Sequence, residues 1–155
     1  METTRNSTLK TSITLVCILT CALFAVPDQV LGQTANITPN RINLTSVGLS
    51  ETVQAIVHMP IEDGYQLSGF DIQLLLGDVW LADAYSFTYC DYDQAFIASF
   101  DKKTIISSDA LTDVAGERVR LTVSGMYTAV NADGNTIECP LSFSGYVWIV
   151  AKGHH

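Results

Sequence analysis

The sequence predicts an all-β fold, an antiparallel β-sandwich of the immunoglobulin-like kind with about seven strands and one short helical crossover. From Asn40 onward, apolar and polar residues alternate in short runs, which is the period of half-buried strands. Gly, Pro, Asn and Asp separate these runs, as turns require. Helical periodicity is nearly absent, and no rhythm of strands and long helices indicates a parallel sheet. A small barrel is the alternative architecture for this pattern.

Each expected strand is a short alternating run. In chain order the strands are Arg41–Thr45, Thr52–Met59, Phe70–Leu76, Trp80–Tyr89, Ala95–Asp101, Glu117–Ser124 and Phe143–Lys152. Alternation predicts that the following residues face the core: Val53, Ala55, Val57, Met59, Phe70, Ile72, Leu74, Leu76, Phe96, Ala98, Phe100, Val119, Leu121, Val123, Phe143, Gly145, Val147 and Ile149. The stretch from Lys102 to Thr112 instead predicts a helical turn that crosses one end of the core.

Residues 1–32 have the pattern of a secretory signal peptide. A weakly basic start precedes an apolar run from Ile13 to Val26, and small residues follow up to Gly32. The run is shorter than the roughly 20 residues that a membrane-spanning helix needs, so a cleaved signal is favoured over an uncleaved anchor. Cleavage after Gly32 would leave a polar arm over 33–39 and one domain over 40–155. We therefore expect a secreted protein, extracellular or at the cell surface, without a stable membrane anchor.

The formal net charge is −8, from 8 Lys and Arg against 16 Asp and Glu. Removal of the signal peptide leaves this charge unchanged, because Arg5 and Lys10 are lost together with Glu2 and Asp28. An acidic surface repels nucleic acid and anionic lipid. The composition therefore excludes nucleic-acid binding and favours cations or basic partners.

The mature chain keeps two of the four cysteines, Cys90 and Cys139, because Cys17 and Cys21 lie in the apolar run. In an oxidising compartment an even pair is more often a disulfide than two thiols. We therefore predict a bridge between Cys90 and Cys139.

Several short motifs resemble those of a loosely defined family of secreted archaeal and bacterial β-sandwich modules, often found beside dockerin-like or cell-surface segments. In order, they are Ile42-Asn43-Leu44-Thr45-Ser46, Thr52 to Pro60, Gly64-Tyr65, Asp91-Tyr92-Asp93, Phe100-Asp101-Lys102 and Val119 to Gly125. The resemblance covers nearly the whole mature chain. It implies a fold and a compartment, and little about activity.

In many members of that family the Asp-Tyr-Asp element continues into an Asn/Asp-Asp-Gly loop of the calcium-binding type. The resemblance therefore implies a calcium site at Asp91 and Asp93, with Asp101 on the adjoining strand as a further ligand. Here Gln94 follows Asp93 directly, and the missing Asp-Gly favours a solvated acidic turn without a cofactor. The cysteines also depart from the family pattern, which supports their pairing.

Catalysis is not expected. A Ser-His-Asp arrangement needs a positioned histidine, whereas His58 faces outward on an expected strand and His154 and His155 end the chain. A glycosidase cleft usually needs more scaffold than one small sandwich. The sequence therefore predicts that the protein is not an enzyme.

Aromatic residues supply the candidate interaction surface. Alternation on the last strand turns Tyr146 and Trp148 away from the core, and Trp80 is a third candidate. A strand covered on both sides is the alternative. Asn36 and Asn43 each begin an Asn-X-Thr sequence and are candidate glycosylation sites.

These observations predict a non-catalytic β-sandwich with a structural or protein-interaction role at the cell exterior. One version is a subunit of a surface assembly or filament that pairs through a strand edge or through the arm over 33–39. A carbohydrate-binding module that uses the aromatic residues is the alternative, and a small hydrolase is the third.

Overall fold

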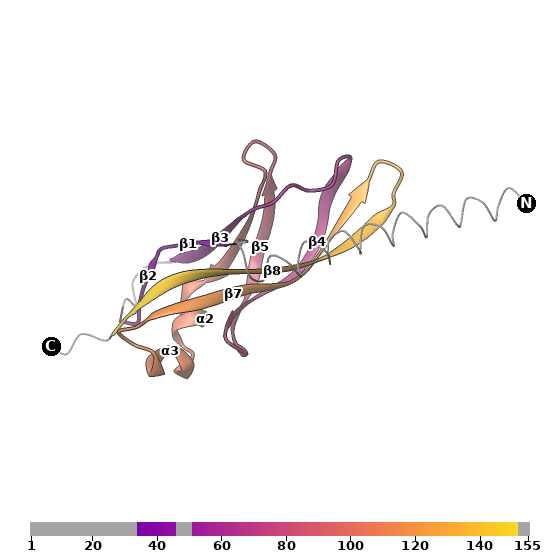
Figure 1. Ribbon diagram of the computed structural model, residues 1–155. Helices are drawn as coiled ribbons and strands as arrows, with labels where there is room; N and C mark the ends of the chain where they lie inside the picture. The colour runs from indigo at the N-terminus through magenta and orange to yellow at the C-terminus, as the bar shows by residue number, and fades with distance from the viewer. Residues whose placement is uncertain (1–33, 46–50, 152–155) are drawn as a thin grey trace, which may run out of the picture.

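The structure is a computed structural model that describes residues 34–45 and 51–151. The predicted signal peptide, His154 and His155 lie outside the described residues. The strands are β1 (Asn36–Thr38), β2 (Arg41–Asn43), β3 (Thr52–His58), β4 (Tyr65–Leu76), β5 (Val79–Cys90), β6 (Ala95–Asp101), β7 (Arg118–Asn131) and β8 (Thr136–Val150) (Figure 1). Two five-residue helices, α2 (Lys102–Ile106) and α3 (Asp109–Asp113), connect β6 to β7. The prediction of an all-β fold is confirmed.

The eight strands form one sheet in the order β1-β3-β6-β5-β4-β7-β8-β2. Neighbouring strands are antiparallel, except that β2 runs parallel to β8. The predicted antiparallel sandwich of seven strands is therefore corrected to a mixed sheet of eight. Register shifts in β4 and β5 bend this sheet around the core. Alternation of apolar and polar residues indicates only that one face of each strand is buried. It therefore does not distinguish a sandwich of two packed sheets from one curved sheet.

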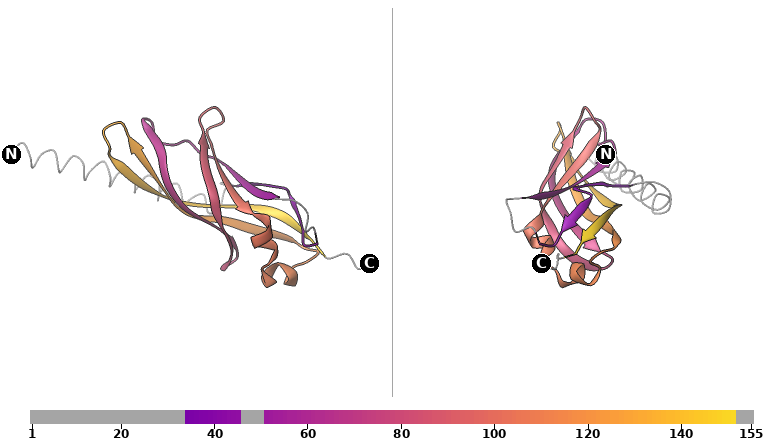
Figure 2. Two further views of the ribbon diagram at one scale, coloured as in Figure 1. Left: turned by 180° about the vertical axis from the view of Figure 1, so that it is seen from behind. Right: turned by 90° about the vertical axis from the view of Figure 1, so that its left-hand side faces the viewer.

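The N-terminal segment closes the curved sheet. β1 and β2 are consecutive in the chain but lie at opposite ends of the strand order. The Ala35 N–H donates to the Ser144 carbonyl at 2.8 Å, beside a parallel bridge between Thr34 and Ser144. The right-hand view of Figure 2 shows these indigo strands crossing the side of the sheet near β8. The two edges thus meet through residues 34–43, and the architecture approaches a barrel, which was the alternative expectation.

The predicted polar arm is therefore part of the domain. Ala35 and Ile37 are buried at 5% and 6% exposure, and Asn36–Thr38 pairs with β3. The alternation pattern missed β1, because three residues with one apolar side chain give no periodic signal. This segment therefore pairs with a strand of its own chain and does not extend toward a neighbouring molecule.

The core includes nearly all of the inward-facing residues that alternation predicts. Most of those residues are buried, and Met59 and Leu76 are partly buried against the core. Phe70 is the exception, at 41% exposure. Its ring contacts Phe87 at 5.7 Å between centroids, so it covers the edge of the core and does not fill its interior.

Alternation predicts the exact bounds of β6, but β4, β5, β7 and β8 are longer than predicted. Of these, β4, β7 and β8 extend beyond the core (Figure 1). The β7–β8 hairpin turns at Asn131, whose side-chain oxygen accepts the backbone N–H groups of Asp133 and Asn135 at 3.0 and 2.9 Å. Pro140 lies within β8, outside the part that pairs with β2. Since β8 is an edge strand there, a residue without an N–H group is tolerated.

The helices close one end of the core, as the sequence predicts. Ile105 of α2 and Leu111 of α3 have no exposed surface. The Asp101 carboxylate caps α2 by accepting the Thr104 N–H at 3.0 Å and the Thr104 hydroxyl at 2.7 Å. Lys102 is buried and pairs with Glu51, which joins α2 to the start of β3.

Candidate interaction surface

The outer face of β2, β8 and β7 combines two exposed aromatic rings with three arginines. Trp148 of β8 lies opposite Arg118 of β7 on one side and opposite Arg41 of β2 on the other. Tyr146 lies opposite Arg120 in the next outward-facing row. Tyr146 is 54% exposed and Trp148 is 46% exposed. We call these five residues the aromatic–arginine face.

Burial of the intervening residues determines this arrangement. Val147 and Ile149 are each 1% exposed, which anchors the inner face of β8 in the core. Successive side chains of a strand point to opposite faces, so Tyr146 and Trp148 must point outward. They are about 7 Å apart along β8. The same alternation in β7 places Arg118 and Arg120 beside them.

Positive charge is concentrated on this face. The three arginines are all the arginines in the described residues. No carboxylate lies within ion-pair distance of them in residues 34–45 and 51–151. The Arg118 guanidinium instead lies 4.6 Å from the centroid of the Tyr146 ring, within the range of a cation–π contact. The face is therefore locally basic on an acidic protein.

An open pocket of about 430 Å³ borders this face. It forms where the chain leaves β8 after Thr34, pairs with β3 as β1, and returns at Asn40, whose carbonyl accepts the Trp148 N–H at 2.9 Å. Its polar lining residues are Thr34, Asn36, Thr38, Asn40, Arg118, Ser144 and Tyr146. The pocket therefore combines one phenol ring and one guanidinium with neutral hydrogen-bonding residues.

Gly145 allows the chain to cross here. A Cβ atom on Gly145 would lie 2.3 Å from the Ala35 carbonyl oxygen and 2.9 Å from Cγ1 of Ile37. Such distances are far below van der Waals contact, so only glycine fits. Sequence alternation placed Gly145 on the inner face but gave no signal of this close approach.

Trp80 lies on the same outer face but is separate from the aromatic–arginine face. It is 49% exposed and sits opposite Leu75, with β4 and β7 between its strand and β8. Three strand spacings amount to about 14 Å. Its Nε1–H donates to the Asp83 carboxylate at 2.8 Å. The structure thus brings together two of the three predicted aromatic residues.

The predicted disulfide is not formed. Cys139 is buried in β8 opposite Tyr127, whereas Cys90 ends β5 opposite Ala95. The strands β4 and β7 separate β5 from β8 in the sheet. The Cys90 thiol lies 3.7 Å from Oδ2 of Asp93, within its own turn. Compartment and an even cysteine count give no information about the position of either strand, which is why the prediction failed.

The three predicted calcium ligands are not brought together. Asp91 and Asp93 are exposed in the turn between β5 and β6, whereas Asp101 lies at the far end of β6, about 20 Å of strand away. Asp101 is engaged with Thr104, whose hydroxyl hydrogen bond above all lowers the pKa of the Asp101 carboxyl. In the described part of the chain, no three His, Cys, Asp or Glu side chains are grouped as metal ligands.

Both candidate glycosylation residues are on the surface of the N-terminal segment. Asn36 is exposed on β1 and also lines the pocket. Asn43 is partly buried, and its side-chain oxygen accepts hydrogen bonds from the backbone N–H and the hydroxyl of Thr45, within the same Asn-X-Thr sequence. Their glycosylation stays a prediction.

Two further observations bear on the class of protein. His58 is exposed on β3, as alternation predicts. Within residues 34–45 and 51–151, the helices lack the length and apolar character needed to cross a membrane.

Comparison with known proteins adds one distant likeness. No protein-family model and no curated protein matches the chain. The crystal structure of SusF from Bacteroides thetaiotaomicron is similar over 79% of this chain, with 17% sequence identity and a TM-score of 0.48. The chain spans 28% of the SusF chain. A likeness at this level carries no argument about function, which must therefore be argued from the surface itself.

Proposed function

We propose that this protein is a non-catalytic binding domain that acts outside the cell by docking a protein partner on the aromatic–arginine face. One observation carries the proposal: every arginine of the described residues lies beside an exposed Trp or Tyr on one face. The predicted signal peptide supports the extracellular setting.

The residue types on this face favour a protein partner. Trp, Tyr and Arg are the residues that most often dominate the binding free energy of protein interfaces. Here they project from paired strands, so little backbone freedom is lost on binding. The contact between Arg118 and Tyr146 orders both side chains before a partner arrives. Three arginines that form no ion pair with a carboxylate of the described residues favour an acidic surface on that partner.

The chemistry of the adjoining pocket supports a role without catalysis. Its lining contains one guanidinium and one phenol, from Arg118 and Tyr146, and no carboxylate, imidazole or thiol among the described residues. General acid–base catalysis most often uses one of these three groups, and a hydroxyl nucleophile is usually activated by one of them as the adjacent base.

Carbohydrate binding is the second candidate, and the same pocket favours it. Hydroxyl and amide side chains from Thr34, Asn36, Asn40 and Ser144 lie beside the Tyr146 ring. Sugar hydroxyls need such hydrogen-bonding groups, and a ring face packs against the apolar side of a sugar. The described arginines are the reason that we place this candidate second, since a neutral glycan does not require them.

Binding of the purified protein, without its signal peptide, to intact cells of its own source tests the proposal. Trp148→Ala should weaken binding by about 10-fold to 100-fold, the range for an interface anchor. Trp80→Ala is the matched control, because Trp80 is equally exposed but lies outside the face. Protease treatment of the cells should abolish binding, whereas periodate oxidation of surface glycans should not. Equal effects of the two tryptophan variants would contradict the proposal, and loss only after periodate would favour the carbohydrate candidate.

A further inference from the structure

We infer that the partner is a second copy of this chain, and that the docking segment is the turn Asp91-Tyr92-Asp93 between β5 and β6. This inference rests on the proposed function. It assigns a role to an acidic turn whose two carboxylates the structure does not bring together with Asp101, the third predicted calcium ligand.

The turn presents an aromatic side chain to solvent. Tyr92 is 95% exposed, the highest value among the large apolar and aromatic residues on the described surface. Burying such a ring against a partner would recover most of the hydrophobic free energy that full exposure loses. Asp91 and Asp93 flank it and are also exposed.

The turn is held in place at its base. Cys90 and Ala95 are the last paired residues of β5 and β6, and the Met59 N–H donates to the Gln94 carbonyl at 3.0 Å. Gln94 has a φ of 47°, which closes the turn tightly. We call the turn Asp91-Tyr92-Asp93 the knob. Because it is held in place, it loses little conformational entropy on docking.

The aromatic–arginine face is complementary to this knob in charge and chemistry. The knob carries one aromatic ring between two carboxylates, and the face carries aromatic rings beside guanidinium groups. A guanidinium can bind a carboxylate through two parallel hydrogen bonds. The pocket beside Tyr146, at about 430 Å³, is an opening next to the face into which the Tyr92 ring would enter, with Arg118 at its border. Charge complementarity is thus local, although the whole chain carries a net charge of −8.

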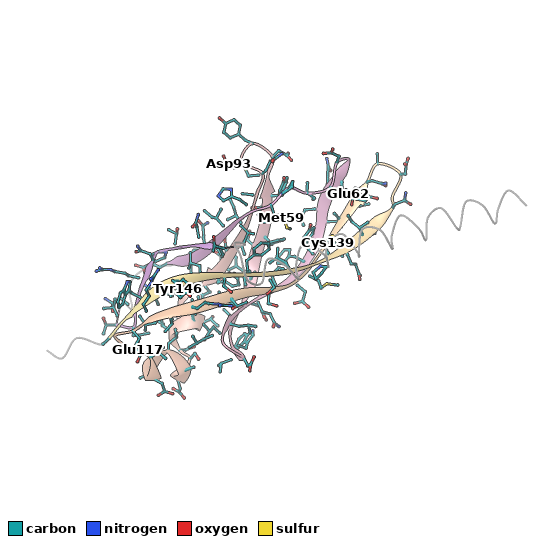
Figure 3. All side chains as sticks on the ribbon, in the orientation of Figure 1. Met59, Glu62, Asp93, Glu117, Cys139 and Tyr146 are labelled. Atoms are coloured by element: carbon teal, nitrogen blue, oxygen red, sulfur yellow. The ribbon has the colours of Figure 1, made fainter. Side chains whose placement is uncertain are left out.

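The contact has to form between copies. Figure 3 shows Asp93 at the tip of the projecting hairpin and Tyr146 along β8, so that the two labelled residues lie apart. Because knob and receiving face are different surfaces, the contact is head-to-tail, and a pair of copies keeps one free knob and one free face. Such contacts build open chains of subunits unless the rotation closes a ring.

Sedimentation velocity of the protein without its signal peptide, over a wide concentration series, tests this inference. The wild-type protein should form species larger than a dimer as the concentration rises. A knob variant, Asp91→Ser with Tyr92→Ser and Asp93→Ser, and a face variant, Arg118→Ser with Trp148→Ala, should each remain monomeric over at least a tenfold wider range. Tyr85→Ser, which removes a 60% exposed ring elsewhere on the surface, is the matched control and should assemble like the wild type.

Mixing the two variants is the sharpest arm of the experiment. The face variant still has an intact knob, and the knob variant still has an intact face, so an equimolar mixture should form a complex of two chains and nothing larger. Thermal unfolding of each variant shows whether it is folded. A wild-type protein that is monomeric throughout, or a knob variant that assembles like the wild type, overturns the inference. If Trp148→Ala still weakens cell binding in that case, the proposed function stands with a different partner.

Discussion

The Arg118 guanidinium lies 4.6 Å from the centroid of the Tyr146 ring, on a strand pair that places Arg118 directly opposite Trp148. Arg118 therefore stands between the two exposed rings of β8 and contacts one of them. At an exposed site such a contact contributes about 0.5–1 kcal/mol. Its larger consequence is that it holds the Arg118 guanidinium against the Tyr146 ring on the aromatic–arginine face.

Trp148→Ala should leave the fold near native, because the side chain is 46% exposed. We expect the free energy of unfolding to fall by about 1–2 kcal/mol, from the half of the ring that is covered. Ile149→Ala, at 1% exposure, should cost roughly 2–5 kcal/mol and serves as the buried comparison. Urea unfolding measures both. A Trp148→Ala loss as large as that of Ile149→Ala would mean that the ring belongs to the core.

Gly145→Ala should displace the crossing of the N-terminal segment. The new Cβ atom would overlap the Ala35 carbonyl oxygen, so we expect a loss of about 1–3 kcal/mol, typical of overpacking. Hydrogen exchange at the Ala35 N–H should become faster, because its bond to Ser144 is part of this crossing. Ser142→Ala, at an exposed position of the same strand, is the control. Unchanged exchange at Ala35 would show that the segment adapts without leaving β8.

The two faces of β7 should respond oppositely to a carboxylate. Leu121 has no exposed surface, so Leu121→Asp buries an unpaired charge and should abolish folding. Thr122 makes a 3.2 Å hydrogen bond with the Ser144 hydroxyl. Because Thr122 is partly exposed, Thr122→Asp should lower the free energy of unfolding by less than about 1 kcal/mol. Circular dichroism of both variants distinguishes them. A similar loss from both would mean that this part of β7 is covered on both sides.

The Asp101 cap should make stability depend on pH. Hydrogen bonds from Thr104 lower the pKa of Asp101 in the folded state relative to the unfolded chain. The stabilisation is therefore fully present above the ordinary aspartate pKa of about 4 and is lost as the pH falls through the lowered value. Asp101→Asn should be less stable than the wild type at neutral pH, and the difference should shrink in acid. Unfolding free energies over a pH series test this, and a constant difference would remove the carboxylate charge as its cause.

Alternation predicted most inner faces of the fold because burial on one side imposes a period of two. Val53, Phe100 and Leu121 were all assigned to the core on this basis and are buried. The path of the N-terminal segment produces no such periodic pattern in the sequence. It depends on pairing between residues far apart in the chain, such as Ala35 with Ser144, and on the absence of a Cβ atom at Gly145.

The candidate site was predictable in part for the same reason. Outward alternation identified Tyr146 and Trp148, but the arginines that flank them belong to two other strands. Arg41 and Arg118 are far apart in the sequence, and both lie opposite Trp148 because β2 and β7 pair with the two edges of β8. Net charge alone favoured basic partners, whereas the distribution of charge in space creates a face suited to acidic ones.

Hydroxyl-radical footprinting tests the central claim, that the aromatic–arginine face is the surface at which this protein meets its partner. Oxidation of Trp148 and Tyr146 would be compared between dilute purified protein and protein in its native extracellular setting. Trp80 and Tyr85 are internal controls, with exposures of 49% and 60%. We expect Trp148 and Tyr146 to be protected in the native setting while the two controls react as in dilute solution. Equal oxidation of Trp148 and Tyr146 in both settings would contradict the claim.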